Sequence, residues 1–290
     1  MNAVVAIDRW LFAAIPARHL RRVRTMLAVL IAVRLLLSPF RALAQVPDSL
    51  FVPVSGLVPF RSPPSVGVIV AVQVTGAAAA LLAATGRRPR LTLPIGWLAL
   101  LALAGLRSSL GKILHNDLLL LLAALPFLAG PDTRDDDEPV SGWPIRTAMV
   151  LIALTYWIIG VQKLVHSGLD WVTGPNMRWI LYSAASEGRA FSREPALFIA
   201  DRPWLATASA AFLLGMELVF PVVLVWRRSR PAMVAAAFVL HAGTWVLLGL
   251  DYWLWAAVVA VVFLVGEPLR RGADPSDRPL AAAAPPRSPG

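Results

Sequence analysis

Long apolar segments separated by short polar ones recur along almost the whole chain. They are continuous runs of Leu, Ala, Val and Ile without the alternation of apolar and polar residues that is typical of strands. Crossing the hydrocarbon core of a bilayer takes about 20 helical residues. Eight segments approach this length: 25–44, 65–85, 91–108, 113–130, 146–165, 204–226, 231–249 and 252–267. The pattern predicts an all-α, polytopic integral membrane helix bundle of about eight transmembrane helices.

Composition and charge agree with this interpretation. Hydrophobic residues make up 58% of the 290 positions and the mean hydropathy is +0.67, too apolar for a soluble domain. The net charge of +10 does not indicate nucleic acid, because the basic residues form short clusters between apolar segments and do not line one face with interleaved aromatics. The absence of cysteine excludes disulfides, thiolate catalysis and Cys-ligated metals.

The basic clusters predict the orientation of the bundle. Arginines gather in the N-terminal arm, in the second and sixth connections, and after the last span. They are Arg18, Arg21, Arg22, Arg24, Arg87, Arg88, Arg90, Arg227, Arg228, Arg230, Arg270 and Arg271. Positively charged connections stay in the cytoplasm, so all four clusters lie on one side and the number of spans is even. We therefore expect a multi-pass protein of the cell membrane with both termini cytoplasmic.

Three parts of unequal size follow from this pattern: a basic arm at 1–24, a transmembrane domain at 25–267, and a tail at 268–290. The tail is rich in Pro, Ala, Arg and Ser and is predicted to be disordered and cytoplasmic. Ala42-Leu43-Ala44 resembles a signal-peptidase site, but the long arm and Arg34 favour a retained first span. No internal repeat is visible, which gives an inverted-repeat transporter no support.

Several ionisable residues fall within predicted spans, where insertion costs about 2.5–3.5 kcal/mol per charge, and Lys163 is one of them. Tyr156, Gly160 and Lys163 share one helix face, and Gly160 allows a helix or a flat ligand to approach closely. A lysine in a low-dielectric site loses proton affinity and can act as a base near neutral pH, which arginine cannot. The alternative is a lysine near a helix end that extends to the outer interface.

Glu217 and His241 lie in the sixth and seventh spans. Three interpretations of Glu217 stay open: it is protonated, it is paired with an arginine such as Arg34, or it lines a hydrated cavity. His241, with Thr244 three residues later, is either a neutral histidine bonded across helices or a functional group. The longest connection, 166–203, is expected to lie along the outer interface with its tryptophans, Trp171 and Trp179, and with Trp204 just beyond it.

His115-Asn116-Asp117 opens the fourth span. Either Asn116 or Asp117 caps the helix, with a carboxylate facing the positive end of the dipole, or the three form a polar cluster at the mouth of a cavity. Capping is the favoured interpretation for Asp117. The spacing of His115 and His241 does not support metal ligation, and no metal is expected. The sequence contains neither a nucleophile elbow nor a glycine-rich phosphate loop.

Several of these residues belong to segments that resemble one family. Tyr156-Trp-Ile-Ile-Gly-Val-Gln-Lys163-Leu, followed by Asp170-Trp-Val-Thr-Gly-Pro-Asn-Met177, is similar to the central motif of vitamin K-dependent gamma-carboxylase and its bacterial relatives, the HTTM (horizontally transferred transmembrane) domain proteins. Gly215-Met-Glu217-Leu-Val-Phe-Pro221 resembles their next span, and His241 with Gly249 the one after. Arg34 fits the first span. The resemblance covers roughly residues 20–265.

The resemblance implies a membrane enzyme that uses a lipid quinol, such as vitamin K hydroquinone. Lys163 would be the catalytic base that deprotonates the quinol, and His241 would be a second catalytic residue. Oxygen addition then gives a strong base that drives carboxylation of glutamate in a peptide. The remaining candidates for the quinol site are Tyr156, Gly160, Glu217, His115, Asn116 and Trp171. His115-Asn116 corresponds to the family's Asn-His pair in reversed order.

Two departures from the family pattern bear on the reaction. Lys163 is eight residues from Trp171, a longer spacing than in the carboxylase. The large lumenal part that helps the carboxylase to bind its peptide has no counterpart after the last span. Quinol chemistry in this chain would therefore not imply that it also carboxylates glutamate. The alternative hypothesis is a non-catalytic membrane factor for the maturation or export of a peptide or protein, a role known in this superfamily for a bacterial toxin peptide.

Overall fold

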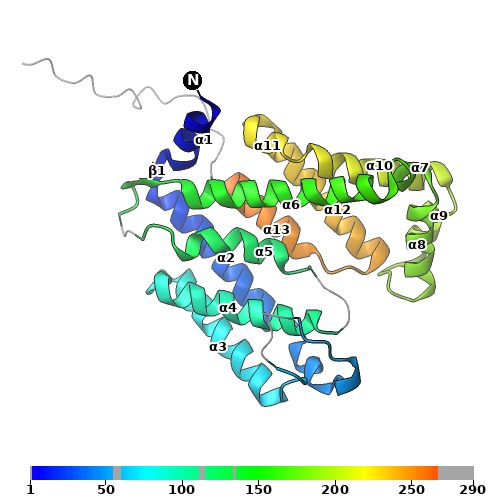
Figure 1. Cartoon of the computed structure of the whole chain (residues 1–290), viewed down its shortest axis with the longest axis horizontal. Coiled ribbons are helices and arrows are strands. Elements are labelled where there is room, and N and C mark those ends of the chain that lie inside the picture. Colours follow the sequence, from blue (N-terminus) through cyan, green and yellow to red (C-terminus); the bar gives the residue numbers. More distant parts are fainter. Residues whose placement is uncertain (1, 55–59, 111–114, 133–134, 267–290) are drawn as a thin grey trace, which may run out of the picture.

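Helices form nearly all the regular structure of the computed structural model, which describes residues 2–54, 60–110, 115–132 and 135–266 (Figure 1). Their buried apolar side chains form one large hydrophobic core, and a small second core lies between α8 (Asn176–Ser186) and α9 (Arg193–Ala200). The all-α prediction is confirmed. A two-stranded antiparallel sheet pairs β1 (Ala14–Pro16), in the N-terminal arm, with β2 (Pro139–Ser141). Strand β2 directly follows an acidic connection, Asp132–Glu138, and precedes α6 (Trp143–Ser167).

The helices differ widely in length. The long ones are α2 (Ala17–Leu37), α3 (Val66–Ala84), α4 (Pro89–Ser108), α6 (Trp143–Ser167), α10 (Pro203–Val219) and α12 (Arg230–Leu248). The shorter ones are α1 (Ala3–Phe12), α5 (Leu118–Ala124), α7 (Asp170–Thr173), α8 (Asn176–Ser186), α9 (Arg193–Ala200), α11 (Val222–Val225) and α13 (Trp253–Ala260). Short 3-10 segments at Phe40–Gln45, Asp48–Leu50, Leu125–Leu128 and Arg227–Ser229, and a π-helical segment at Val261–Val265, extend or connect them.

Among the described residues, four helices are long and apolar enough to cross a membrane: α3, α4, α6, and α12 together with its preceding turn. A fifth is added if α9 and α10, which meet at an angle of 101°, count as one broken span. The other predicted spans also fall on helices, but α2 contains five arginines and the apolar helices at 118–128 and 253–265 are short. Four or five candidate spans are compatible with a multi-pass membrane protein.

The N-terminal arm is part of the bundle because its arginines meet the acidic connection before α6. Helix α2 begins at Ala17, eight residues before the predicted span. Arg24 binds Asp132 at 3.0 Å, while Arg18 and Arg21 pair with Asp137 and Asp136. The basic arm and the acidic connection therefore neutralise each other at one end of the bundle. The predicted tail, 268–290, and the arginines within it lie outside the described residues.

Small residues allow the closest helix contacts. Helices α3 and α4 pack side by side (Figure 1), and a Cβ on Gly76 of α3 would lie only 2.3 Å from the Cβ of Ala99 on α4. Any larger residue at Gly76 would separate the two helices. Such small-residue contacts are characteristic of helix pairs in membranes.

Helix α6 runs through the middle of the molecule, between α5 on one side and α10 on the other (Figure 1). The long connection after α6 consists of α7, α8 and α9. Trp179 is exposed on it, and Trp204 is exposed just beyond it, at the start of α10. At the end of α8, Glu187 accepts hydrogen bonds from Arg189 (2.7 Å) and Ser183 (2.5 Å), and these bonds lower the pKa of its carboxyl. This connection is thus a folded structure that covers one end of α6, α10 and α12.

Candidate functional site

The amine of Lys163 forms an ion pair with Glu217 across the interface between α6 and α10. Its Nζ lies 2.5 Å from Oε1 and 2.7 Å from Oε2, so one ammonium group is shared by both carboxylate oxygens. The side chains are 19% and 7% exposed, respectively. The amine therefore turns back toward the neighbouring helix instead of standing free in solvent. Lys163, and not the arginine considered from sequence, is the partner of Glu217.

Gly160 makes this pairing possible. It lies three residues before Lys163 on α6, directly against α10. A Cβ at Gly160 would be 3.1 Å from the Cβ of Glu217 and 3.0 Å from Cδ2 of Leu218. The missing side chain lets the two helices approach closely, so the short carboxylate of Glu217 can meet the amine.

Trp171 of α7 covers the pair from the connection. The Lys163 Nζ lies 5.0 Å from the centre of the indole ring, within the range of a cation–π contact. The indole Nε1 is buried and has no hydrogen-bond partner among the described residues. Four sequence candidates, Gly160, Lys163, Trp171 and Glu217, thus form one group.

Tyr156, seven residues before Lys163 on α6, forms a second group with His241. The Tyr156 hydroxyl lies 2.7 Å from Nε2 of His241 on α12, and both side chains are buried. The Tyr156 ring stacks on Phe220 with a centroid distance of 4.3 Å, and Trp255 stands edge-on to both Tyr156 and His241. His241 is therefore bonded across helices, while its Nδ1 has no partner among the described residues.

His115 and Asn116 join this aromatic group through the segment between α12 and α13. Nε2 of His115 lies 2.8 Å from the hydroxyl of Tyr252, whose ring is 6.0 Å from that of His241. Asn116 donates its side-chain amide to the Asp251 carbonyl at 2.8 Å, and its own carbonyl accepts from the Trp255 indole at 3.0 Å. The sequence indicated none of Asp251, Tyr252 or Trp255.

Asp117 is the centre of a buried ionic cluster. It is 1% exposed and accepts from Nε of Arg34 at 2.6 Å and from Arg107 on α4. A second nitrogen of Arg34 donates to Asp251 at 2.5 Å. Asp117 occupies the N-cap position of α5, as predicted. Its side chain makes no capping hydrogen bond, because both carboxylate oxygens accept hydrogen bonds from arginines. Arg107 was not recognised from sequence.

An apolar groove of about 360 Å³ opens between α8, α10 and α12, and its described lining includes neither Lys163 nor Glu217. Its wall includes Ser209 and Leu213, which lie eight and four residues before Glu217 and therefore on the same face of α10. On α12 it includes Gly243 and Thr244, just after His241. The volume lies within the range of small-ligand sites. In the described part of the chain, no three metal-ligating side chains are grouped together.

No protein-family model matches the chain, and neither a curated protein nor a solved structure gives a significant match. The resemblance to the gamma-carboxylase and HTTM family therefore stays a prediction that depends on the sequence motifs around Lys163, Glu217 and His241.

Proposed function

We propose that this chain is an HTTM-like membrane enzyme in which the Lys163–Glu217 pair exchanges a proton with a lipid-soluble acid, most simply a quinol. In this proposal the eight helical segments cross the cell membrane and both termini face the cytoplasm, as the arginine clusters favour. The observation that carries the proposal is the shared contact of one partly buried amine with both oxygens of one buried carboxylate, at 2.5 and 2.7 Å.

Such a pair can serve as a base without an isolated charge in the membrane. The proton between Nζ and the carboxylate can lie on either partner, giving an ion pair or a neutral amine beside a neutral acid. The low dielectric of the site favours the neutral form more than water does. The neutral amine can accept a proton from a quinol hydroxyl, which leaves a quinol anion next to an ammonium group. The Coulomb attraction between them stabilises that anion where water is excluded.

The apolar groove between α8, α10 and α12 supports binding of an aromatic ring one turn of α10 before Glu217. Its wall is mainly Leu, Phe, Val and Met side chains, and the hydroxyls of Ser209 and Thr244 provide polar contacts. A quinol ring placed there would have its hydroxyl near the end of the groove where Glu217 follows Leu213. His241 lies just before the groove residues Gly243 and Thr244 on α12, so its hydrogen-bonded contact with Tyr156 provides a second acid and base.

Substitution of Lys163 by arginine tests the proposal. The guanidinium can still pair with Glu217, so folding should persist, but it does not release its proton. We expect Lys163→Arg in lipid nanodiscs to lose oxygen-dependent conversion of vitamin K hydroquinone, while mass spectrometry still finds quinone bound to the purified protein. Lys112→Arg is the matched control, since Lys112 is the other lysine of the sequence. An active Lys163→Arg variant would refute the role of the amine.

A second candidate function, a non-catalytic factor for peptide or protein maturation, is favoured by one observation. The connection after α6 exposes large apolar side chains, with Leu169 72%, Trp179 67% and Phe191 71% exposed. Exposed apolar surface of this kind occurs where proteins bind partners or lie in a membrane interface. This function requires that Lys163→Arg be tolerated and that Trp179→Ala abolish activity in cells.

A further inference from the structure

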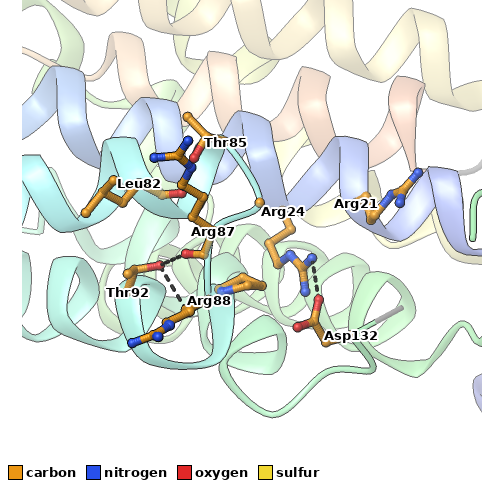
Figure 2. A pocket seen from close by; sticks show the side chains of 10 residues that line it. Arg21, Arg24, Leu82, Thr85, Arg87, Arg88, Thr92 and Asp132 are labelled. Atoms are coloured by element: carbon orange, nitrogen blue, oxygen red, sulfur yellow. Dashed lines mark hydrogen bonds and ion pairs between the residues drawn. The ribbon is translucent and has the colours of Figure 1, made fainter. Parts of the chain in front are cut away.

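A basic cavity of about 850 Å³ opens where α2 passes the turn between α3 and α4 (Figure 2). Among the described residues that line it, four are arginines, Arg21, Arg24, Arg87 and Arg88, and one is acidic, Asp132. It lies at the opposite end of α2 from the Arg34–Asp117 cluster and shares no residue with the proposed proton-transfer site.

Two of the four arginines are already neutralised. Arg24 is buried and binds Asp132 at 3.0 Å, and Arg21 pairs with Asp136. Arg87 and Arg88 are exposed, and neither has an ion-pair partner among the described residues. Figure 2 shows both side chains extending from the α3–α4 turn. The cavity thus has two uncompensated positive charges at its edge.

The turn itself holds these two arginines in place. Arg88 has a φ of +46°, the left-handed region that a residue with a Cβ rarely adopts. The Thr92 hydroxyl lies 3.1 Å from the carbonyl of Arg87 and 3.2 Å from that of Arg88, so it fixes the turn. Helix α4 begins at the next residue, Pro89, and the positive end of its dipole adds to the field in the cavity.

We propose that this cavity binds the phosphate group of an anionic phospholipid from the cytoplasmic leaflet. Guanidinium groups bind phosphate oxygens with two parallel hydrogen bonds, and Arg87 and Arg88 are free to do so. Leu81 and Leu82 are exposed on the last turn of α3, so an acyl chain can lie along α3 below the headgroup. This apolar surface beside the charges favours a lipid over a free phosphate.

The inference rests on the proposed orientation, which places this end of the bundle in the cytoplasm, but not on the chemistry of Lys163. Basic pockets between transmembrane helices on that side are suited to anionic headgroups because the leaflet itself is negatively charged. The headgroup would hold the ends of α2, α3 and α4 together at the membrane surface.

Native mass spectrometry of the detergent-purified chain tests the inference. Phosphatidylglycerol and phosphatidylcholine are titrated against the unaltered protein and an Arg87→Gln/Arg88→Gln variant. One surface arginine contributes about 5-fold to anionic-lipid affinity, so the double variant should bind phosphatidylglycerol about 25-fold more weakly. The Arg87→Lys/Arg88→Lys variant retains the charge and should still prefer phosphatidylglycerol. A Lys163→Met variant should bind it normally, which separates this site from the proposed enzyme chemistry.

The control is Arg90→Gln/Arg228→Gln, which makes the same change in charge at exposed arginines outside the cavity lining. Thermal melting of every variant verifies the fold. Equal affinity of the Arg87/Arg88 variant and the parent, an equal loss in the control, or equal binding of phosphatidylcholine would each overturn the inference. Glycerol phosphate is added as a soluble competitor. If it displaces phosphatidylglycerol at equal concentration, the site binds free phosphate and the lipid assignment is wrong.

Discussion

The cluster around Asp117 predicts a large effect for one isosteric substitution, Asp117→Asn. The carboxylate accepts from Arg34 of α2 and from Arg107 of α4, and it stands at the start of α5. Two arginines and two aspartates, the second being Asp251, make the cluster neutral as a whole. Asparagine keeps the shape of the side chain but removes the negative charge, so the cluster is left with a net positive charge in a buried place.

The magnitude follows from what each partner retains. Arg34 keeps Asp251, whereas Arg107, whose side chain is 18% exposed, loses the carboxylate that it contacts. Removing one member of a buried ion pair typically costs about 3–5 kcal/mol because it leaves an uncompensated charge. Asp251 is 46% exposed, so Asp251→Asn leaves water near Arg34 and should cost about 1 kcal/mol. Asp137→Asn, at the exposed pair with Arg18, should cost less than about 1 kcal/mol.

Thermal unfolding of the purified protein in one detergent, followed by tryptophan fluorescence, measures this order. We expect the Tm to fall steeply for Asp117→Asn, slightly for Asp251→Asn and hardly at all for Asp137→Asn. Since these three variants lose the same formal charge, only the burial and pairing of each carboxylate distinguish them. Equal Tm values for Asp117→Asn and Asp137→Asn would show that the Asp117 cluster does not hold α2, α4 and α5 together.

Two further substitutions test the interfaces of α6. Gly160→Val places atoms within about 3 Å of Leu218 and forces α10 away, so it should cost about 1–3 kcal/mol and abolish quinol turnover. Gly215→Val is its control, since no neighbouring helix among the described residues comes within 4 Å of the added Cβ, and an equal loss in Tm would contradict the close approach at Gly160. Tyr156→Phe leaves Nε2 of the buried His241 without its partner and should cost about 1–3 kcal/mol in a melting experiment. A phenylalanine variant as stable as the parent would mean that this hydrogen bond is replaced by water.

The helix positions were largely predictable from the sequence. The predicted segments 65–85 and 91–108 correspond to α3 at Val66–Ala84 and α4 at Pro89–Ser108. A continuous apolar run of this length must satisfy its backbone hydrogen bonds internally, so a helix is the only local solution. The segment 113–130 was less well predicted, because Pro126 ends α5 after a short run and a single 3-10 turn follows.

The partners of the polar residues were not predictable, because they depend on which helices become neighbours. Arg34 binds residues that are 83 and 217 positions away, and no local pattern encodes such distances. Arg107 did offer a signal, since a charge at the end of an apolar helix requires a partner. Tyr252 and Trp255, by contrast, lie in a connection and at the start of a short helix. Aromatic residues are common at such positions in membrane proteins, so their presence there did not indicate a site.

The ion pair between Lys163 and Glu217 at the α6–α10 interface requires an explanation other than stability. Replacing a buried ion pair by well-packed apolar residues is often neutral or stabilising, so the stability of the α6–α10 interface does not by itself account for the pair. Gly160 brings the helices close enough for the contact, at the expense of the helix propensity that a larger residue would supply. Both features disfavour a purely structural explanation of the amine. They are consistent with a site in which a proton has to move between two groups held at hydrogen-bond distance, and this is the property that the proposed quinol chemistry requires.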